Sequence, residues 1–167
     1  MRIVSKQIYF RCSIRKPANG CASDPLPFKF LSRDPSLCKE AVFVDVDYKQ
    51  LMSRKCEMVR TTPELRTVIS LDPNSQLLKD GVMIDCPSYK AVACDLEDMP
   101  GLDKLLTQTL DLKGDPVLFL AEVSITYMDS LKAERLIEWA SGFTEGRSTK
   151  QLLFKRKLTR LSTLCCP

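Results

Sequence analysis

Ala41-Val-Phe-Val-Asp-Val-Asp-Tyr48 is the stretch of sequence from which the fold can be inferred. It is a short run of apolar and β-branched residues that ends in a carboxylate and leads directly into a helical pattern. Lys90-Ala-Val-Ala-Cys-Asp95 and Pro116-Val-Leu-Phe-Leu-Ala-Glu122 repeat this design, and each ends in an acid. Each run has the length of a strand and is apolar enough to be buried on both faces, as strands of a parallel sheet are.

Helical patterns and turn signals lie between these runs. The periodicity predicts helices over residues 48–59, 102–112 and 131–143, a short helix beginning near residue 28, and a basic amphipathic helix over 151–161. It also predicts a short strand over 65–71 and a weak one at 8–10, and it leaves 76–90 without a regular element. In the helix over 48–59, Lys55 is assigned to the polar face. The alternation of strands and helices indicates an α/β protein with a doubly wound sheet.

The composition is that of a globular domain with an uneven distribution of charge. The chain has 167 residues, of which 44% are hydrophobic and 28% charged. Residues 1–23 carry five basic groups and residues 147–167 carry six, with no acid in either segment. The middle of the chain therefore has 14 basic groups against 21 acids. The basic ends indicate either nucleic-acid binding or segments that do not belong to the fold.

The residue types exclude several kinds of site. There is no histidine, and the eight cysteines show no C-x-x-C spacing. A Cys/His zinc site and a histidine-activated nucleophile are therefore excluded, and we expect no metal. Scattered cysteines are typical of reduced thiols, which predicts a cytoplasmic protein. No secretory signal is visible, and the longest apolar run, residues 117–128, is interrupted by Glu122 and too short to span a membrane.

Carboxylates at the ends of strands predict a polar site, because ligands of open α/β sheets bind outside the carboxyl ends of the strands. Asp47 is the candidate for holding the two ribose hydroxyls of an adenosine cofactor, opposite the glycine turn Gly20-Cys-Ala-Ser-Asp24. The alternative, equally weighted for Asp47, is that Asp45 and Asp47 belong to a helix N-terminus. For Asp98 and Asp129 the capping interpretation is favoured. Glu122 interrupts an apolar run, where an acid is costly unless it is paired or at a site.

A wider set of motifs resembles a known family. Gly20-Cys-Ala-Ser-Asp-Pro-Leu-Pro-Phe28, Val44-Asp-Val-Asp-Tyr48 with Lys55, Cys94-Asp-Leu96, and the run to Glu122 with Thr126-Tyr127 together resemble the leucine carboxyl methyltransferases. These are S-adenosylmethionine-dependent enzymes of the Rossmann-like class I fold. The Asp-Pro-Leu-Pro-Phe version resembles the branch that methylates a modified guanosine of phenylalanine tRNA in wybutosine biosynthesis. A sister branch methylates the C-terminal leucine of the protein phosphatase 2A catalytic subunit.

The resemblance implies roles for individual residues. It implies an S-adenosylmethionine site formed by Gly20, Asp24, Asp47, Asp95, Leu96 and Glu122, with Tyr127 in the substrate cleft. It implies no catalytic residue, because the acceptor carboxylate is already ionised at pH 7 and needs no general base. Catalysis would then depend mainly on the alignment of donor and acceptor.

The chain also departs from the family pattern. Ala22 stands where the family has a second glycine, and the first strand and the C-terminal strands of the sheet are expected to be missing. We therefore predict a degenerate segment at 1–18, a partial methyltransferase domain at 19–147, and a basic tail outside the fold at 148–167. This leaves open an active enzyme and an inactive fragment. Either methyl acceptor, or a non-catalytic RNA-binding module, is compatible with these features.

Overall fold

A six-stranded sheet forms the centre of the computed structural model, which describes residues 7–12, 25–36, 38–39, 41–75, 81–110, 117–122, 128–143 and 150–155; for residues 7–12, 121–122 and 150–155 only the backbone is described. The strands are β1 (Gln7–Cys12), β2 (Ala41–Asp47), β3 (Val82–Asp85), β4 (Tyr89–Ala93), β5 (Val117–Glu122) and β6 (Lys150–Lys155). Their order across the sheet is β3-β4-β2-β1-β5-β6. All neighbours are parallel except β3 and β4, which form an antiparallel hairpin at one edge.

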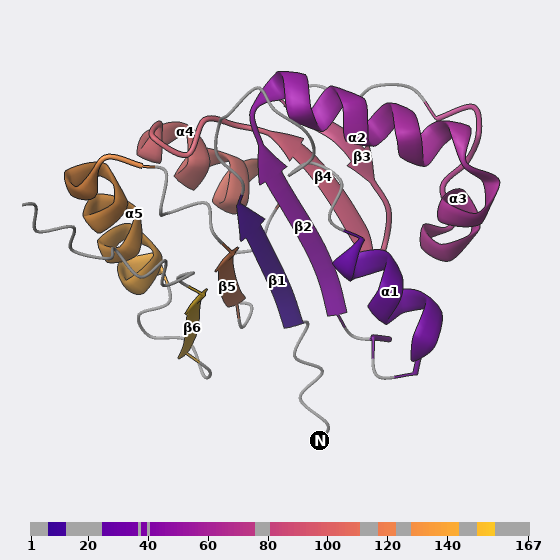
Figure 1. Ribbon diagram of the computed structural model, residues 1–167, viewed down its shortest axis with the longest axis horizontal. Helices are drawn as coiled ribbons and strands as arrows, with labels where there is room; N and C mark the ends of the chain where they lie inside the picture. The colour runs from indigo at the N-terminus through magenta and orange to yellow at the C-terminus, as the bar shows by residue number, and fades with distance from the viewer. Residues whose placement is uncertain are drawn as a thin grey trace, which may run out of the picture.

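The first strand is present, which corrects the expectation that it is missing. β1 lies in the middle of the sheet, parallel to β2 on one side and to β5 on the other (Figure 1). Polar Gln7 and Arg11 flank its three apolar residues, so the local pattern is weak. Its pairing partners are remote in sequence, since Gln7 pairs with Ala41 and Ile8 with Val117. A strand held by such distant neighbours leaves little trace in its own sequence.

The C-terminal basic segment also differs from the expectation. Residues 150–155 form β6, which pairs in parallel with β5 from Val117–Lys150 to Glu122–Lys155. The predicted amphipathic helix over 151–161 is therefore wrong for its described part, and this part lies in the sheet rather than outside the fold. Gln151-Leu-Leu-Phe154 is short and apolar, so its periodicity does not distinguish a strand from a helix. The boundaries drawn at residues 18 and 147 remain predictions.

Three helices cover one face of the sheet near β2 and β4. They are α1 (Leu26–Arg33), α2 (Lys49–Thr61) and α3 (Pro63–Ile69). Phe28, Met52, Val59 and Ile69 from these helices pack with Phe43 of β2 in one hydrophobic cluster. The predicted strand over 65–71 is wrong, because residues 65–69 belong to α3. Pro63 starts this helix and Ser70 ends it in the left-handed region, at φ 56°.

The opposite face is covered by the helices of the second half of the chain. α4 (Met99–Lys104) continues into a π-helical turn, η2 (Leu105–Thr109), and α5 (Ser130–Phe143) follows β5. Leu102, Leu106 and Leu136 pack there against Val44 and Phe119 of the sheet. All seven residues of β2 are buried, because this strand is covered on both faces. The predicted strands at 41–46, 90–94 and 117–121 and the helices over 48–59 and 131–143 are confirmed within a few residues.

The hairpin at the edge explains why residues 76–90 had no clear pattern. β3 is only four residues long, and its pairing with β4 is irregular between Val82 and Ile84. Gly81 precedes it at φ 83°, and a Cβ there would lie 2.7 Å from the carbonyl oxygen of Ala93. Only glycine tolerates both conditions. Gly81 thus lies beside the end of β4, where its carbonyl oxygen accepts a hydrogen bond from the N–H of Ala93.

The order of the strands reverses at β1. From β1 the chain moves to β2 and then to β4 on one side, with α1 to α3 on one face of the sheet. After β4 it returns to the other side of β1, where it adds β5 and β6 with α5 on the second face (Figure 1). In open sheets of this kind, ligands bind outside the carboxyl ends of the strands at the point of reversal. The topology therefore places a candidate site where β1, β2 and β5 end.

Candidate functional site

Asp47 is the last residue of β2, at the carboxyl edge and next to the point of reversal. Its side chain is buried, at 3% exposure, and its Oδ1 atom accepts a hydrogen bond of 2.7 Å from the backbone N–H of Tyr48. Its carbonyl oxygen accepts a second bond from the N–H of Cys94, which ties the end of β2 to the end of β4. Helix α2 begins after Tyr48 with no side-chain cap, so Asp47 is not its N-cap.

Burial of Asp47 determines how it can receive a ligand. A carboxylate can accept bonds from two neighbouring hydroxyls, which fits a ribose. The Oδ1 atom of Asp47 already accepts a hydrogen bond from Tyr48, and a carboxylate has further acceptor sites that a ribose could use. The carboxylate acceptor and its place at the end of the strand fit an adenosine group.

The loop after β4 places Asp95 and Leu96 differently. Asp95 is exposed, and its Oδ1 atom accepts a hydrogen bond from the N–H of Glu97 at 2.9 Å. Leu96 is 1% exposed and packs into the cluster formed with α4 and α5. The loop therefore presents the Asp95 carboxylate at the edge and anchors itself through Leu96.

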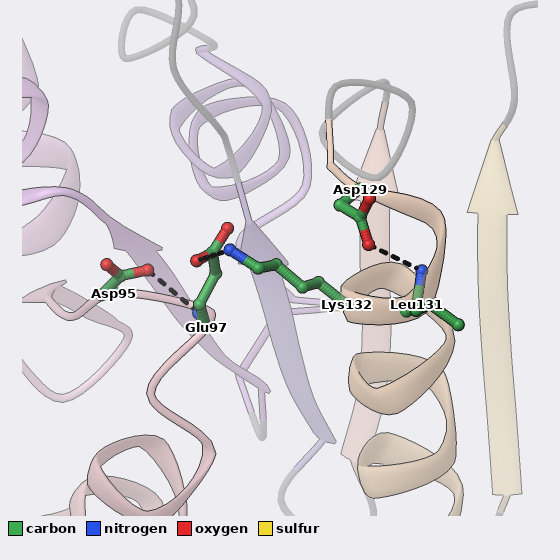
Figure 2. A network of polar contacts seen from close by, with 5 residues as sticks. All are labelled: Asp95, Glu97, Asp129, Leu131 and Lys132. Atoms are coloured by element: carbon green, nitrogen blue, oxygen red, sulfur yellow. Dashed lines mark hydrogen bonds and ion pairs between the residues drawn. The ribbon is translucent and has the colours of Figure 1, made fainter.

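An ion pair crosses the carboxyl edge between the two halves of the sheet. Lys132 of α5 reaches toward the loop after β4, and its Nζ lies 2.6 Å from Oε2 of Glu97 (Figure 2). The Glu97 hydrogen bond and charge raise the pKa of Lys132. Both side chains are substantially exposed, so the pair is screened by solvent and links the loops without fixing them strongly.

Two acids near this edge serve as helix caps, as the sequence indicated. Asp98 accepts a hydrogen bond of 3.0 Å from the N–H of Gly101 at the start of α4. Asp129 accepts one of 3.0 Å from the N–H of Leu131 at the start of α5 (Figure 2). Both contacts satisfy backbone donors of a first helical turn.

The remaining predicted site residues are only partly placed. Glu122 is the last residue of β5 at the carboxyl edge, on the other side of β1 from Asp47, and only its backbone is described. Gly20, Asp24 and Tyr127 lie outside the described residues, as does Ala22. The structure thus gathers the ends of β2, β4 and β5 at one edge. The roles assigned to these six cofactor residues and to Tyr127 remain predictions.

A buried charged cluster lies beneath this edge. Lys55 of α2 places its Nζ 2.5 Å from Oδ2 of Asp45, and the hydroxyl of Tyr89 donates to the same oxygen at 2.8 Å. The Lys55 ammonium also lies 6.0 Å from the ring centroids of Tyr89 and Phe28. Burial, and then the charge and hydrogen bond of Asp45, raise the pKa of Tyr89 well above its usual value. The cluster consists of Asp45, Lys55, Tyr89 and Phe28.

This cluster is what the sequence interpretation missed. Asp45 lies inside β2 and is not a helix cap, and Lys55 is buried rather than on the polar face of α2. A signal was present, because Lys55 shares its helical spacing with the buried residues Met52, Cys56 and Val59. A lysine within an apolar face indicates a buried partner, and Asp45 is that partner.

Other chemistries find no support in the part of the chain that the structure describes. No group of three or more cysteine, aspartate or glutamate side chains there could hold a metal ion. None of the described helices is long and apolar enough to cross a membrane. Cys38, Cys56, Cys86 and Cys94 are all unpaired thiols, and burial raises the pKa of each.

Comparison with known proteins gives one consistent result. Residues 20–141 match the family model described as leucine carboxyl methyltransferase. A protein of Aspergillus oryzae named tRNA wybutosine-synthesizing protein 4 is 40% identical over 127 residues, which cover 75% of this chain and 12% of that protein. Proteins of the same name from Schizosaccharomyces pombe and Saccharomyces cerevisiae are 32% and 33% identical over 130 and 129 residues, with 19% of each relative covered. The matched segment thus spans less than a fifth of the length of these relatives.

Proposed function

The chain belongs to the leucine carboxyl methyltransferase family, and on that premise we propose that it is the cofactor-binding part of an S-adenosylmethionine-dependent carboxyl methyltransferase of wybutosine synthesis. The observation that carries the proposal is the reversal of strand order at β1, with Asp47 at the end of the neighbouring strand. This is the place where an open α/β sheet binds a nucleotide-like ligand. We further propose that the sheet is a Rossmann-like class I methyltransferase fold.

Each residue at this edge of the sheet would contact a different portion of S-adenosylmethionine or of the cleft around it. Asp47 would accept hydrogen bonds from the ribose hydroxyls, and Asp95 with the backbone of Leu96 would lie beside the adenine. By the family resemblance, Gly20 and Asp24 would belong to the cofactor loop, and Glu122 and Tyr127 would line the cofactor and substrate cleft. When bound, S-adenosylmethionine supplies an activated methyl group on its sulfonium.

The acceptor chemistry agrees with the residues that the chain contains. A carboxylate acceptor is ionised at pH 7, so it would accept the methyl group without prior loss of a proton, and S-adenosylhomocysteine would leave. The chain has no histidine, and a carboxylate acceptor requires no general base. The protein would contribute alignment and exclusion of water.

The relatives suggest the acceptor. They are named as wybutosine-synthesizing proteins, and wybutosine is a modified base of tRNA. We therefore propose a tRNA carrying a carboxylate on its modified guanosine, with phenylalanine tRNA as the specific substrate. A cytoplasmic location follows from the interpretation of the cysteines and is part of the same proposal.

Cofactor binding is the direct test, since it does not require the parts of the relatives that lie beyond the matched segment. Isothermal titration calorimetry with S-adenosylmethionine should show binding by the native chain. Asp47→Asn keeps the size of the side chain and removes its charge, so affinity should fall about 10-fold or more. Asp103→Asn changes an exposed acid of α4 and serves as the matched control. A folded native chain that shows no heat of binding would contradict the proposal.

The family name itself favours one other acceptor, a C-terminal leucine carboxylate such as that of the protein phosphatase 2A catalytic subunit. Transfer of labelled methyl from S-adenosylmethionine to a leucine-terminated phosphatase peptide, with none to a carboxylated tRNA, would select it. A non-catalytic RNA-binding module would instead bind tRNA with steep salt dependence and no cofactor. Truncation would not test the RNA-binding hypothesis, because it would remove β6 from the sheet. Charge-neutralising substitutions at Arg156, Lys157 and Arg160 test it instead.

A further inference from the structure

Lys55 of α2 lies where three other elements near the proposed ribose site meet. Its ammonium contacts Asp45 of β2 and the ring of Tyr89 of β4, and it lies over Phe28 of α1. Helix α1 starts two residues after Asp24, and α2 starts directly after Tyr48. Four elements, α1, β2, α2 and β4, therefore meet at one buried ammonium group.

Asp45 and Asp47 are coupled through the geometry of the strand. They are two residues apart in β2, so both side chains project from the same face of the sheet. Asp45 is held by Lys55 and Tyr89 through its Oδ2 atom, which fixes this part of the strand against α2 and β4. Asp47 lies two residues farther along the strand, and its carbonyl oxygen accepts a hydrogen bond from the N–H of Cys94. The position of the Asp47 carboxylate thus depends on where the cluster holds β2.

Stability alone does not account for the cluster. Burying two charges is costly, and apolar residues of similar size often replace a buried ion pair without loss of stability. The Oδ1 atom of Asp45 has no hydrogen-bond partner among the described residues. Packing alone therefore gives no strong reason for a buried ion pair at this place.

We infer that Lys55 is a positioning residue for S-adenosylmethionine binding, which holds the Asp47 carboxylate in register with the ribose hydroxyls through Asp45. This inference rests on the proposed function. It predicts that removal of the ion pair weakens recognition of the ribose even where the fold is preserved.

The experiment separates positioning from folding. In the double variant Asp45→Asn/Lys55→Met both members of the described ion pair are neutral, and the Tyr89 hydroxyl can still donate to the amide oxygen. Lys90→Met is the matched control, because Lys90 also pairs with an acid, Asp85, but projects from the opposite face of β4 to Tyr89. Calorimetry measures binding of S-adenosylhomocysteine and of its 2′-deoxy form, and thermal unfolding confirms that each variant is folded.

The ratio of the two affinities reports the ribose contact. The native chain should prefer the ribose form about 10-fold, as expected for hydrogen bonds to a charged group. The double variant should bind the ribose form about 10-fold more weakly, as is typical when outer partners of a binding group are removed. In the double variant the ratio of the affinity for the ribose form to that for the deoxy form should fall toward one. Lys90→Met should keep both the native affinity for the ribose form and the native ratio.

Each other outcome has a distinct meaning. If the native chain binds neither ligand, the proposed function fails and the inference with it. If the native chain binds but the double variant keeps its ribose preference, whether or not both affinities fall together, only the inference is overturned. If the double variant does not fold, the ratio is measured in Tyr89→Phe, which keeps the ion pair but removes one hydrogen bond from Asp45. The ratio must fall there as well, and an unchanged ratio overturns the inference.

Discussion

Tyr89→Phe tests the energetics of the buried cluster with the smallest possible change. The substitution removes one hydroxyl from a side chain that is 0% exposed and keeps the ring, which lies 5.0 Å from that of Phe28. The hydroxyl donates to Asp45 at 2.8 Å, and the acceptor is a buried carboxylate. A hydrogen bond to a charged group contributes about 1.5–3 kcal/mol, so we expect the free energy of unfolding to fall by about 2 kcal/mol.

Urea unfolding can measure this loss through Trp139, the single tryptophan of the chain. Trp139 packs against Phe119 on the opposite face of the sheet from Tyr89, so its fluorescence reports loss of the whole fold rather than of the cluster. With a denaturant slope of about 2 kcal/mol per molar urea, the midpoint should move down by about 1 M. The thermal midpoint should fall by about 4–8 °C for a chain of this size.

A variant without the Asp45 charge provides the control. In the Asp45→Asn/Lys55→Met background, which does not leave the Lys55 ammonium buried without its carboxylate, the tyrosine hydroxyl meets a neutral acceptor, so Tyr89→Phe should cost only about 1 kcal/mol there. A midpoint shift below about 0.2 M in the native background would be no larger than that of a neutral surface substitution. It would refute the conclusion that the Tyr89 hydroxyl donates to a buried carboxylate.

The other predictions concern local strain and thiol chemistry. Gly81→Ala should destabilise the fold by about 2 kcal/mol, because φ is positive and the new Cβ meets the carbonyl oxygen of Ala93. Gly142→Ala has open space around its Cβ, so it should stabilise α5 by about 0.5–1 kcal/mol in the same urea titration. Cys94 should react with iodoacetamide at pH 8 about 100-fold more slowly than an ordinary thiol, since burial and the nearby acids raise its pKa to about 11; peptide mapping that finds rapid labelling would contradict this. Burial likewise raises the pKa of Cys56 to about 11. The folded state therefore favours the neutral thiol, so the contribution of Cys56 to stability should be constant below pH 9 and be lost as pH rises from 9 to 11, and stability should fall less steeply over that range in Cys56→Ala.

The sequence by itself determined the parts of this protein that rest on local pattern. β2 and β5 are apolar runs bounded by turn signals, and α2 and α5 repeat apolar residues at helical spacing. Such patterns appear within one segment, so they are visible before any contact is known. The family resemblance also lies in the sequence, since it depends on the order of short motifs.

Pairing between distant segments was decided only by the tertiary structure. β1 and β6 are stabilised by neighbours roughly 30 residues away or more. The sequence indicated β1 only as a weak strand at 8–10, and the sequence of β6 does not distinguish a strand from a helix. The same holds for Lys55, whose charge suggests an exposed position until Asp45 and Tyr89 are seen beside it. A buried charge is acceptable only when its partners are in place, and those partners come from other elements. The polar cluster beneath Asp47 is therefore a property of the fold, while Asp47 itself could be chosen from the sequence.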